Sequence, residues 1–358
     1  MENNFYGNGQ QNGWQTSPPN SPYGYYNYGA YVNSDYYKNL QKSEREKKLI
    51  KKIGTTCGIG ALLYLVFAYT FSFAVAILSK VIKPLQVIFS DLTATHAFDA
   101  ITSVLSLGLP FFLVYLILRR KKLVKALPYE KPKNIESAKY LTMLSVPVMV
   151  FSSLFVNYIS AIVQTILGVE FNSNLSDTKL SGIGSIIIII VSMSVVPALM
   201  EEFVVRGVVL QPLRKFGDKF AIIVSALFFS MLHGNMLQIP YTFVGGLILG
   251  YLAVKTKSLW PPMILHFVNN FYSVIVMIVS DNFSDKAANY TAYGIWVLFA
   301  VLGVVGFIGY MKNQEKTSLH KSESILSIKE KVVAFIKNGP MIVAIIVYSF
   351  MAIKSIAF

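Results

Sequence analysis

The central stretch of this chain reads Ile183-Gly-Ser-Ile-Ile-Ile-Ile-Ile-Val-Ser-Met-Ser-Val-Val-Pro-Ala-Leu-Met-Glu201-Glu202-Phe-Val-Val-Arg206. Its uncharged part, 183–200, approaches the length of about 20 apolar residues that a membrane-spanning helix needs. The run ends in two adjacent carboxylates and an arginine. A charge at the centre of a membrane helix costs about 2.5–3.5 kcal/mol on insertion scales, so these residues are a functional hypothesis by default.

The composition of the whole chain is that of a membrane protein. Of its 358 residues, 54% are hydrophobic and 14% are charged, whereas a soluble domain carries about 25% charged residues. The net charge of +14 does not indicate a nucleic-acid partner, because most lysines and arginines flank apolar segments, where they set membrane topology. The single cysteine, Cys57, excludes an internal disulfide and a cysteine-rich zinc site.

The apolar segments predict an all-α fold, a polytopic transmembrane helix bundle of about eight or nine helices. The expected spans are 54–79, 100–118, 140–167, 183–204, 220–236, 239–254, 260–280, 292–311 and 339–356. With the N-terminus in the cytoplasm, 27 of the 32 lysines and arginines lie on the inner side, as the positive-inside rule requires. The sequence therefore predicts a multi-pass protein of the cell membrane, in contact with the lipid bilayer.

Composition divides the chain into four parts. Residues 1–45 are rich in Asn, Tyr and Gly and predict a disordered cytoplasmic tail. Residues 46–181 predict N-terminal transmembrane helices, residues 182–276 a helical core that carries the chemistry, and residues 277–358 the C-terminal transmembrane helices. Within the last part, residues 318–338 alternate charged and apolar side chains at helical spacing, which predicts an amphipathic helix on the inner leaflet.

The spacing of the central charges separates the two glutamates. Residues four apart share a helix face, so Glu202 and Arg206 are expected to neutralise each other. Glu201 turns away from Arg206 and is expected to face a cavity, where a partly desolvated carboxylate suits a general base. Pro197 removes one backbone hydrogen bond and is expected to kink the helix. A competing interpretation is a charge cluster at the inner membrane interface, with Arg206 reaching into water.

Two of the four histidines, His233 and His266, lie within expected spans. Phe229 precedes His233 by one helical turn, and Asn270 follows His266 by one turn, so each pair shares a face. A lone histidine on an apolar helix is more often a hydrogen-bonded core residue than a functional one. Two histidines beside an uncompensated glutamate favour a functional site.

These side chains can together hydrolyse a peptide bond. Glu201 with His233 can activate a water molecule, and His266 with Asn270 can donate hydrogen bonds to the tetrahedral oxyanion. The chain has no Gly-x-Ser-x-Gly, which disfavours a serine hydrolase, and no His-Glu-x-x-His, which excludes a zincin. No cofactor is required on this interpretation. A zinc ion held by Glu201, His233 and His266 stays open, because these are permitted ligands.

Three motifs in order resemble the signature of the CAAX protease and bacteriocin-processing (Abi) family, the type II CAAX prenyl endopeptidase-like proteins. They are Glu201-Glu202-x-x-x-Arg206, Phe229-x-x-x-His233 and His266-x-x-x-Asn270, within a matched core of residues 182–276. The resemblance implies an intramembrane endopeptidase in which Glu201 and His233 activate water and His266 and Asn270 form the oxyanion hole. It makes Glu202, Arg206 and Phe229 supporting residues. The family was first described as metal-dependent and later given a metal-free glutamate mechanism, which we favour.

The resemblance implies a peptide or protein substrate: a prenylated C-terminus, a leader peptide or another membrane segment. Two other functions stay open. The family has members linked to bacteriocin immunity or scaffolding, and such a protein would bind a peptide or membrane enzyme without turnover. The ionisable groups would alternatively relay protons in a transporter, although basic and amide donors on one helix fit an oxyanion better. No oligomeric state follows from the sequence.

Overall fold

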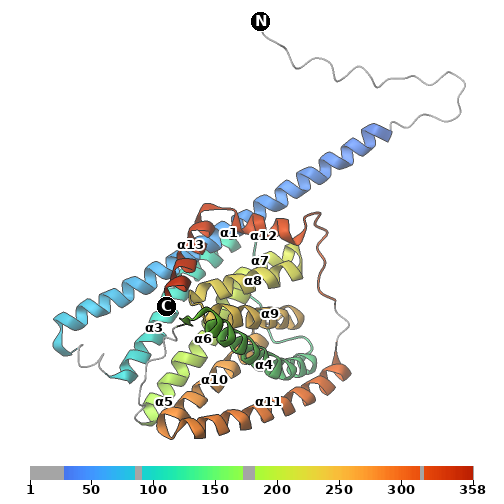
Figure 1. Ribbon diagram of the computed structural model, residues 1–358. Coiled ribbons are helices and arrows are strands. Elements are labelled where there is room, and N and C mark those ends of the chain that lie inside the picture. The colour runs from blue at the N-terminus through green and yellow to red at the C-terminus, as the bar shows by residue number, and fades with distance from the viewer. Residues whose placement is uncertain (1–27, 85–90, 172–181, 315–317, 358) are drawn as a thin grey trace, which may run out of the picture. The chain divides into compact units, whose positions relative to one another are not determined.

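The computed structural model describes residues 28–84, 91–171, 182–314 and 318–357 (Figure 1). Residues up to Arg45 and residues from Glu46 onward form separate units, and every candidate site residue lies in the second. Helix α1 covers Tyr28–Val81. It includes residues 28–45, which the composition wrongly predicts to be disordered, while residues 1–27 of the expected tail lie outside the described residues. The helix-forming Lys, Glu, Arg and Leu side chains that follow residue 35 favour this extension.

The remaining described residues are almost entirely helical, which confirms the all-α class. The helices are α3 (Leu92–Arg120), α4 (Ile135–Leu167), α5 (Ile183–Ile190), α6 (Val196–Glu202), α7 (Gln211–Leu213), α8 (Asp218–His233), α9 (Gln238–Thr256), α10 (Trp260–Asn282), α11 (Asp285–Asn313), α12 (Ile328–Ile336) and α13 (Gly339–Lys354). Two π-helices, η1 (Val191–Val195) and η2 (Phe203–Leu210), and a 3₁₀ turn, η3 (Arg214–Phe216), lie between them. Two-residue strands β1 (Glu170–Phe171) and β2 (Ile356–Ala357) pair antiparallel.

The described helices support a multi-pass membrane protein with fewer spans than nine. Seven are long and apolar enough to cross a membrane, and the bent pair α12–α13 brings the number to eight. Helix α8, expected as a span, has 16 residues, fewer than the roughly 20 that a bilayer requires. Helix α13 also has 16 residues and meets the test only with α12, from which it is bent by 87°.

The central stretch is one continuous span, 183–216, but not one uniform α-helix. The π-helix η1 comes immediately before α6, whose second residue is Pro197. Proline has no N–H to donate to the carbonyl one turn earlier, so the helix must change its hydrogen-bonding register there. Glu201 and Glu202 end α6, and η2 follows directly. Both glutamates therefore sit at a junction between α- and π-helical backbone, a feature frequent at functional sites.

Helix η2 is the most deeply buried of these segments. Val204, Val205, Val208 and Val209 are all fully buried, in the same core cluster as α8 residues such as Phe228. A helix that is apolar on all sides is expected in a protein interior. Arg206 lies in the middle of η2, so its charge is held inside the core and does not reach the aqueous interface.

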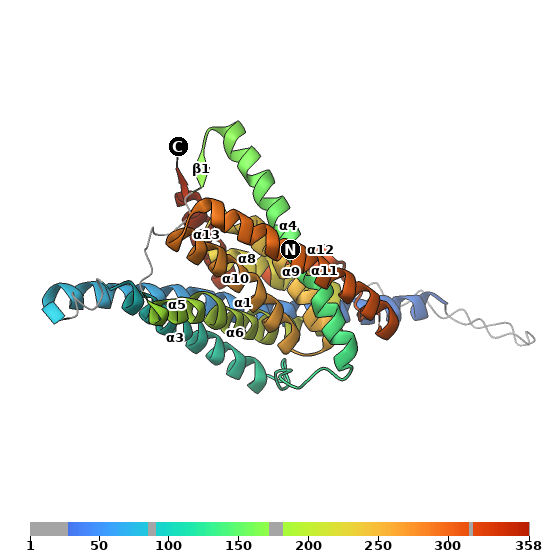
Figure 2. The same ribbon diagram turned by 90° about the horizontal axis from the view of Figure 1, so that it is seen from below.

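The helix packing brings the site segments together. Helix α8 packs against α9 and η2, and α10 packs against α6 and η1. Figure 2 shows α5 and α6 running beside α3, an arrangement that the contacts between these helices confirm. The loop between α3 and α4 is fixed to the start of α10, since the Leu259 amide donates to the Pro128 carbonyl (2.9 Å) and the Trp260 indole donates to the Tyr129 carbonyl (2.8 Å).

Candidate functional site

A buried group of three charged or titratable side chains forms the base of the site. Arg206 Nη1 lies 2.7 Å from Oε1 of Glu202, and neither side chain is exposed. The same Oε1 atom lies 2.8 Å from Nδ1 of His266. Arg206 also donates from Nη2 to the carbonyl of Gly246 on α9 at 3.1 Å. The ion pair expected from the sequence is thus present, and His266 joins it from a helix 64 residues further along the chain.

The buried Glu202–Arg206–His266 group does not form all the hydrogen bonds that its polar atoms could make. Glu202 Oε2 and Arg206 Nε are buried and have no hydrogen-bond partner among the described residues. A buried ion pair without its full set of hydrogen bonds adds little to stability over apolar packing, because desolvation offsets the attraction. What the ion pair does contribute is a fixed contact with Nδ1 of His266, which holds the imidazole in place.

Glu201 lies at the edge of this group and is more accessible than Glu202. Its side chain is 26% exposed, and its Oε2 lies 3.7 Å from Nε2 of His266. The two nitrogens of His266 therefore face the two glutamates, one each. Glu201 also lines a cavity of about 190 Å³, as the helical spacing predicted. A water molecule or a peptide carbonyl in this cavity would meet the accessible carboxylate and not the buried one.

His233 ends α8 and lines the same cavity as Glu201. Its Nδ1 lies 2.9 Å from the carbonyl oxygen of Phe229. A carbonyl can only accept, so Nδ1 carries the proton, and in the neutral ring Nε2 is left with a lone pair. Gly234 follows in the left-handed conformation (φ 53°) and lets the chain turn away directly after the imidazole. The local backbone thus fixes which nitrogen of His233 is available for proton transfer.

The ring of Phe229 connects these groups. It packs edge-on against both imidazoles, with centroid distances of 4.8 Å to His233 and 5.9 Å to His266. The guanidinium carbon of Arg206 lies 4.8 Å from the ring centroid, a cation–π distance. Phe229 is therefore the common spacer that sets the relative positions of both histidines.

Asn270 is placed differently from the expectation. The sequence paired it with His266 on one helix face, but His266 bonds instead to Glu202. Oδ1 of Asn270 accepts a hydrogen bond of 3.3 Å from the amide of Asn269, and Asn270 does not line the cavity that holds Glu201 and His233. Helical spacing specifies which residues share a face, whereas the partner across the helix interface depends on packing.

The positions of the side chains can be compared with those that a bound zinc ion would need. No group of three or more His, Cys, Asp or Glu residues that could hold a metal ion is present in the described part of the chain. His233 directs Nδ1 to a carbonyl, and His266 has both nitrogens directed at carboxylates. Because metal-binding histidines usually hold their other ring nitrogen on a carbonyl or carboxylate in this way, these contacts leave Nε2 of each ring to a ligand, and zinc held by Glu201, His233 and His266 stays an alternative.

Two further polar residues line the reactive cavity and carry no motif in the sequence. They are Tyr64 on α1 and Gln238 at the start of α9. Tyr64 lies about 140 positions before Glu201 in an apolar span, and tyrosine is common in such spans, so no sequence pattern distinguishes it. Only the packing of α1 against the core brings it to the site.

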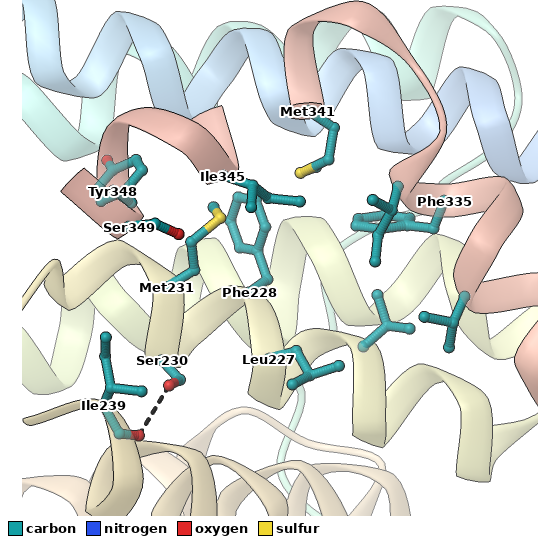
Figure 3. Close-up of a pocket in the computed structure, with 13 residues that line it drawn as sticks. Leu227, Phe228, Ser230, Met231, Ile239, Phe335, Met341, Ile345, Tyr348 and Ser349 are labelled. Atoms are coloured by element: carbon teal, nitrogen blue, oxygen red, sulfur yellow. Dashed lines mark hydrogen bonds between the residues drawn. The ribbon is translucent and has the colours of Figure 1, made fainter. Parts of the chain in front are cut away.

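A larger cavity lies on another face of α8 and has a different character. It measures about 310 Å³ and is lined mainly by apolar side chains of α8, α12 and α13, including Phe228, Met231 and Ile345 (Figure 3). The hydroxyl of Ser230 already donates a hydrogen bond to the Ile239 carbonyl at 2.8 Å, so this proton is not available to a bound molecule. Its lining residues include no carboxylate or imidazole, whereas those of the smaller cavity include both.

Comparison with known proteins finds a family that matches the segment carrying these residues. Residues 183–272 match the family model described as type II CAAX prenyl endopeptidase Rce1-like. The matched segment contains Glu201, His233 and His266 and is similar to membrane-embedded CAAX-type proteases. More particularly, the match supports an Rce1-like CAAX prenyl endopeptidase domain over this segment of the chain.

Two curated proteins illustrate the relationship. YdiL of Bacillus subtilis (strain 168), which carries the name of a membrane peptidase, is 24% identical over 192 residues, covering 53% of this chain and 76% of YdiL. The membrane-embedded CAAX protease MroQ of Staphylococcus aureus (strain USA300) is 31% identical over 113 residues, covering 28% of this chain and 43% of MroQ. The chain thus spans less than half the length of MroQ. No solved structure matches the chain.

Proposed function

We propose that this chain is an intramembrane endopeptidase that hydrolyses a peptide bond with a glutamate-activated water molecule. The observation that carries the proposal is that Glu201 and His233, from two different helices, line one small cavity within the segment that matches the protease family. A partly exposed carboxylate beside an imidazole with a free nitrogen is the arrangement that general-base hydrolysis requires.

In the proposed reaction, Glu201 accepts a proton from water while the water oxygen attacks the peptide carbonyl carbon. Electrons of the C=O bond move to oxygen and form a tetrahedral oxyanion. The oxyanion then re-forms the C=O bond as the C–N bond breaks, and the leaving nitrogen takes the proton from Glu201, which gives a carboxylic acid and an amine. His233, with its lone pair on Nε2, orients the water and shares the proton.

This proposal assigns the oxyanion to His266, which lies beside Glu201, while Asn270, which the family resemblance pairs with it, does not line the cavity. His266 lies with Nε2 3.7 Å from Glu201, close enough to contact a carbonyl bound at that carboxylate. Its Nδ1 donates to Glu202, which in turn is held by Arg206, so Nε2 can donate to the oxyanion only when the ring carries a proton on both nitrogens. Glu202 and Arg206 are therefore positioning residues for the His266 ring. Pre-positioned donors of this kind are often the largest single contribution to catalysis.

For the substrate, we propose the C-terminal or leader segment of a membrane-associated peptide, including a prenylated CAAX-type C-terminus. Support comes from the family description and from the name of the related MroQ. The bilayer position of the site restricts access to segments that partition into the membrane. We further propose that the N-terminus faces the cytoplasm, on the distribution of lysine and arginine.

The test is cleavage of peptides by the purified protein in detergent and in proteoliposomes. The panel contains a farnesylated CAAX peptide, the same peptide without the lipid, and a hydrophobic leader peptide. Wild type is compared with Glu201→Gln and with Glu136→Gln, a control in an exposed ion pair on α4. We expect cleavage by wild type and the control, and a loss of at least about a hundredfold in Glu201→Gln, the scale of general-base catalysis.

A chelator series separates the two mechanisms. Glutamate-dependent cleavage that persists after treatment with a strong chelator and dialysis supports the metal-free reaction. If activity is lost and returns with zinc, the metal-free mechanism is wrong. If neither wild type nor variant cleaves any member of the panel, the endopeptidase proposal fails and binding without turnover replaces it.

A further inference from the structure

Tyr64 reaches the reactive cavity from a part of the chain outside the family segment. It lies on α1, far from the matched residues 183–272, yet it lines the cavity together with Glu201 and His233. The phenol therefore shares a cavity with the carboxylate that the proposed reaction uses as its base.

The hydroxyl of Tyr64 has no hydrogen bond to any described residue, although the side chain is partly buried. Buried tyrosine hydroxyls usually find a partner. By contrast, the hydroxyl of Tyr348, which lies on α13, donates to the Ala61 carbonyl on α1 at 3.2 Å. An unengaged phenol in a cavity beside a base is thus available to a bound molecule.

Of the other donors near Glu201, the His266 imidazole is already engaged, while the Gln238 amide shares the cavity with Tyr64. His266 directs Nδ1 to Glu202 and Nε2 towards Glu201. Asn270 does not line the cavity. A carbonyl bound between Glu201 and His233 consequently has two neutral donors beside it, Tyr64 and Gln238, and the phenol is the more acidic of the two.

We propose that Tyr64 is a further catalytic residue, whose hydroxyl donates a hydrogen bond to the carbonyl oxygen of the scissile peptide as that oxygen becomes an oxyanion; this inference rests on the proposed endopeptidase function. The hydroxyl keeps its proton throughout. The water proton still goes to Glu201 and then to the leaving amine, so the balance of the reaction is unchanged. The gain comes from a neutral donor that meets developing negative charge in a site sheltered from water.

The test replaces only the hydroxyl. Tyr64→Phe keeps the ring that packs in α1, and Tyr69→Phe is the matched control, because Tyr69 lies on the same helix with its side chain 62% exposed. Both variants are assayed for kcat and KM on a peptide that wild type cleaves, and for thermal stability in detergent. We expect kcat of Tyr64→Phe to fall about a hundredfold, as for removal of one oxyanion donor, with KM within twofold. Tyr69→Phe should match wild type.

A second measurement separates transition-state from ground-state contact. A peptide phosphonamidate, which imitates the charged tetrahedral state, should bind Tyr64→Phe about a hundredfold more weakly than wild type, whereas the uncleaved peptide should bind the double variant Glu201→Gln, Tyr64→Phe as it binds Glu201→Gln. Unchanged kcat in Tyr64→Phe, or an effect confined to KM, overturns the role of Tyr64 while leaving the endopeptidase intact. Absence of cleavage by wild type overturns both.

Discussion

Oε1 of Glu202 lies 2.7 Å from Nη1 of Arg206, one helical turn away, and both side chains are fully buried. The pair is held between the cavity and the α9 backbone, where Arg206 also donates to the Gly246 carbonyl. Removal of one member of a buried ion pair leaves an uncompensated charge in a low-dielectric interior, which is more costly than the absence of the whole pair.

The first prediction follows from this pair. Glu202→Ala should destabilise the protein by about 3–5 kcal/mol, the cost of a buried charge left without its partner. Thermal unfolding in detergent measures the effect. Glu136→Ala is the control, since its ion pair with Lys139 is exposed and its loss should leave the melting temperature unchanged. Equal melting temperatures for Glu202→Ala and wild type would contradict the structural role of the pair.

Phe229 gives a prediction that separates positioning from stability. Phe229→Leu removes the ring that contacts both imidazoles, so kcat should fall about ten- to a hundredfold, because small misplacements of reacting groups are costly. Phe228→Leu is the control: it is also buried, but its ring packs against Phe111 at 5.9 Å. Both variants should lose similar stability, and only the first should lose activity. Parallel losses in both would show that Phe229 acts through packing alone.

Gly306 on α11 tests the packing of α11 against α4. A Cβ at this position would meet the Leu144 amide nitrogen and lie 2.9 Å from the Met143 carbonyl carbon. Gly306→Ala should therefore destabilise the protein by about 1–3 kcal/mol through overpacking. Gly294→Ala on the same helix meets nothing within 4 Å and should be neutral or stabilise by up to about 1 kcal/mol through helix propensity. If Gly306→Ala and Gly294→Ala unfold at the same temperature, the close contact between α11 and α4 at Gly306 is contradicted.

Lys331 on α12 fixes the C-terminal segment to the core. Its ammonium is buried and donates to the Phe216 carbonyl at 2.7 Å, at the end of η3. A cation at a helix C-terminus interacts favourably with the last carbonyls. Lys331→Met, which keeps the apolar stem, should destabilise by about 1.5–3 kcal/mol, the range for a charge-assisted hydrogen bond. It should also speed amide hydrogen exchange in α12.

Lys329→Met provides the comparison, because Lys329 is exposed on the same short helix. It should change neither the melting temperature nor the exchange rate of α12. If the amides of α12 exchange at the wild-type rate in Lys331→Met, the helix is held in place by other contacts.

The sequence correctly predicted the features that depend on local geometry. The all-α membrane class follows from the length and spacing of the apolar segments. The Glu202–Arg206 contact follows from the four-residue spacing within one helix, and the outward turn of Glu201 follows from the same rotation. These relationships hold because a helix fixes the distance between nearby residues whatever it packs against. The nine expected spans were too many, because α8 and α13 are each too short to cross a bilayer alone.

Only the tertiary structure decided which helices meet and at what rotation. It brought His266 to Glu202 where the sequence paired it with Asn270, and it brought Tyr64 from α1 to the cavity of Glu201. These contacts depend on how side chains of different helices interlock, and a rotation of one helix by a single residue would exchange one partner for another. The sequence therefore determined the chemical groups and their places on each helix, while packing determined the site that they form.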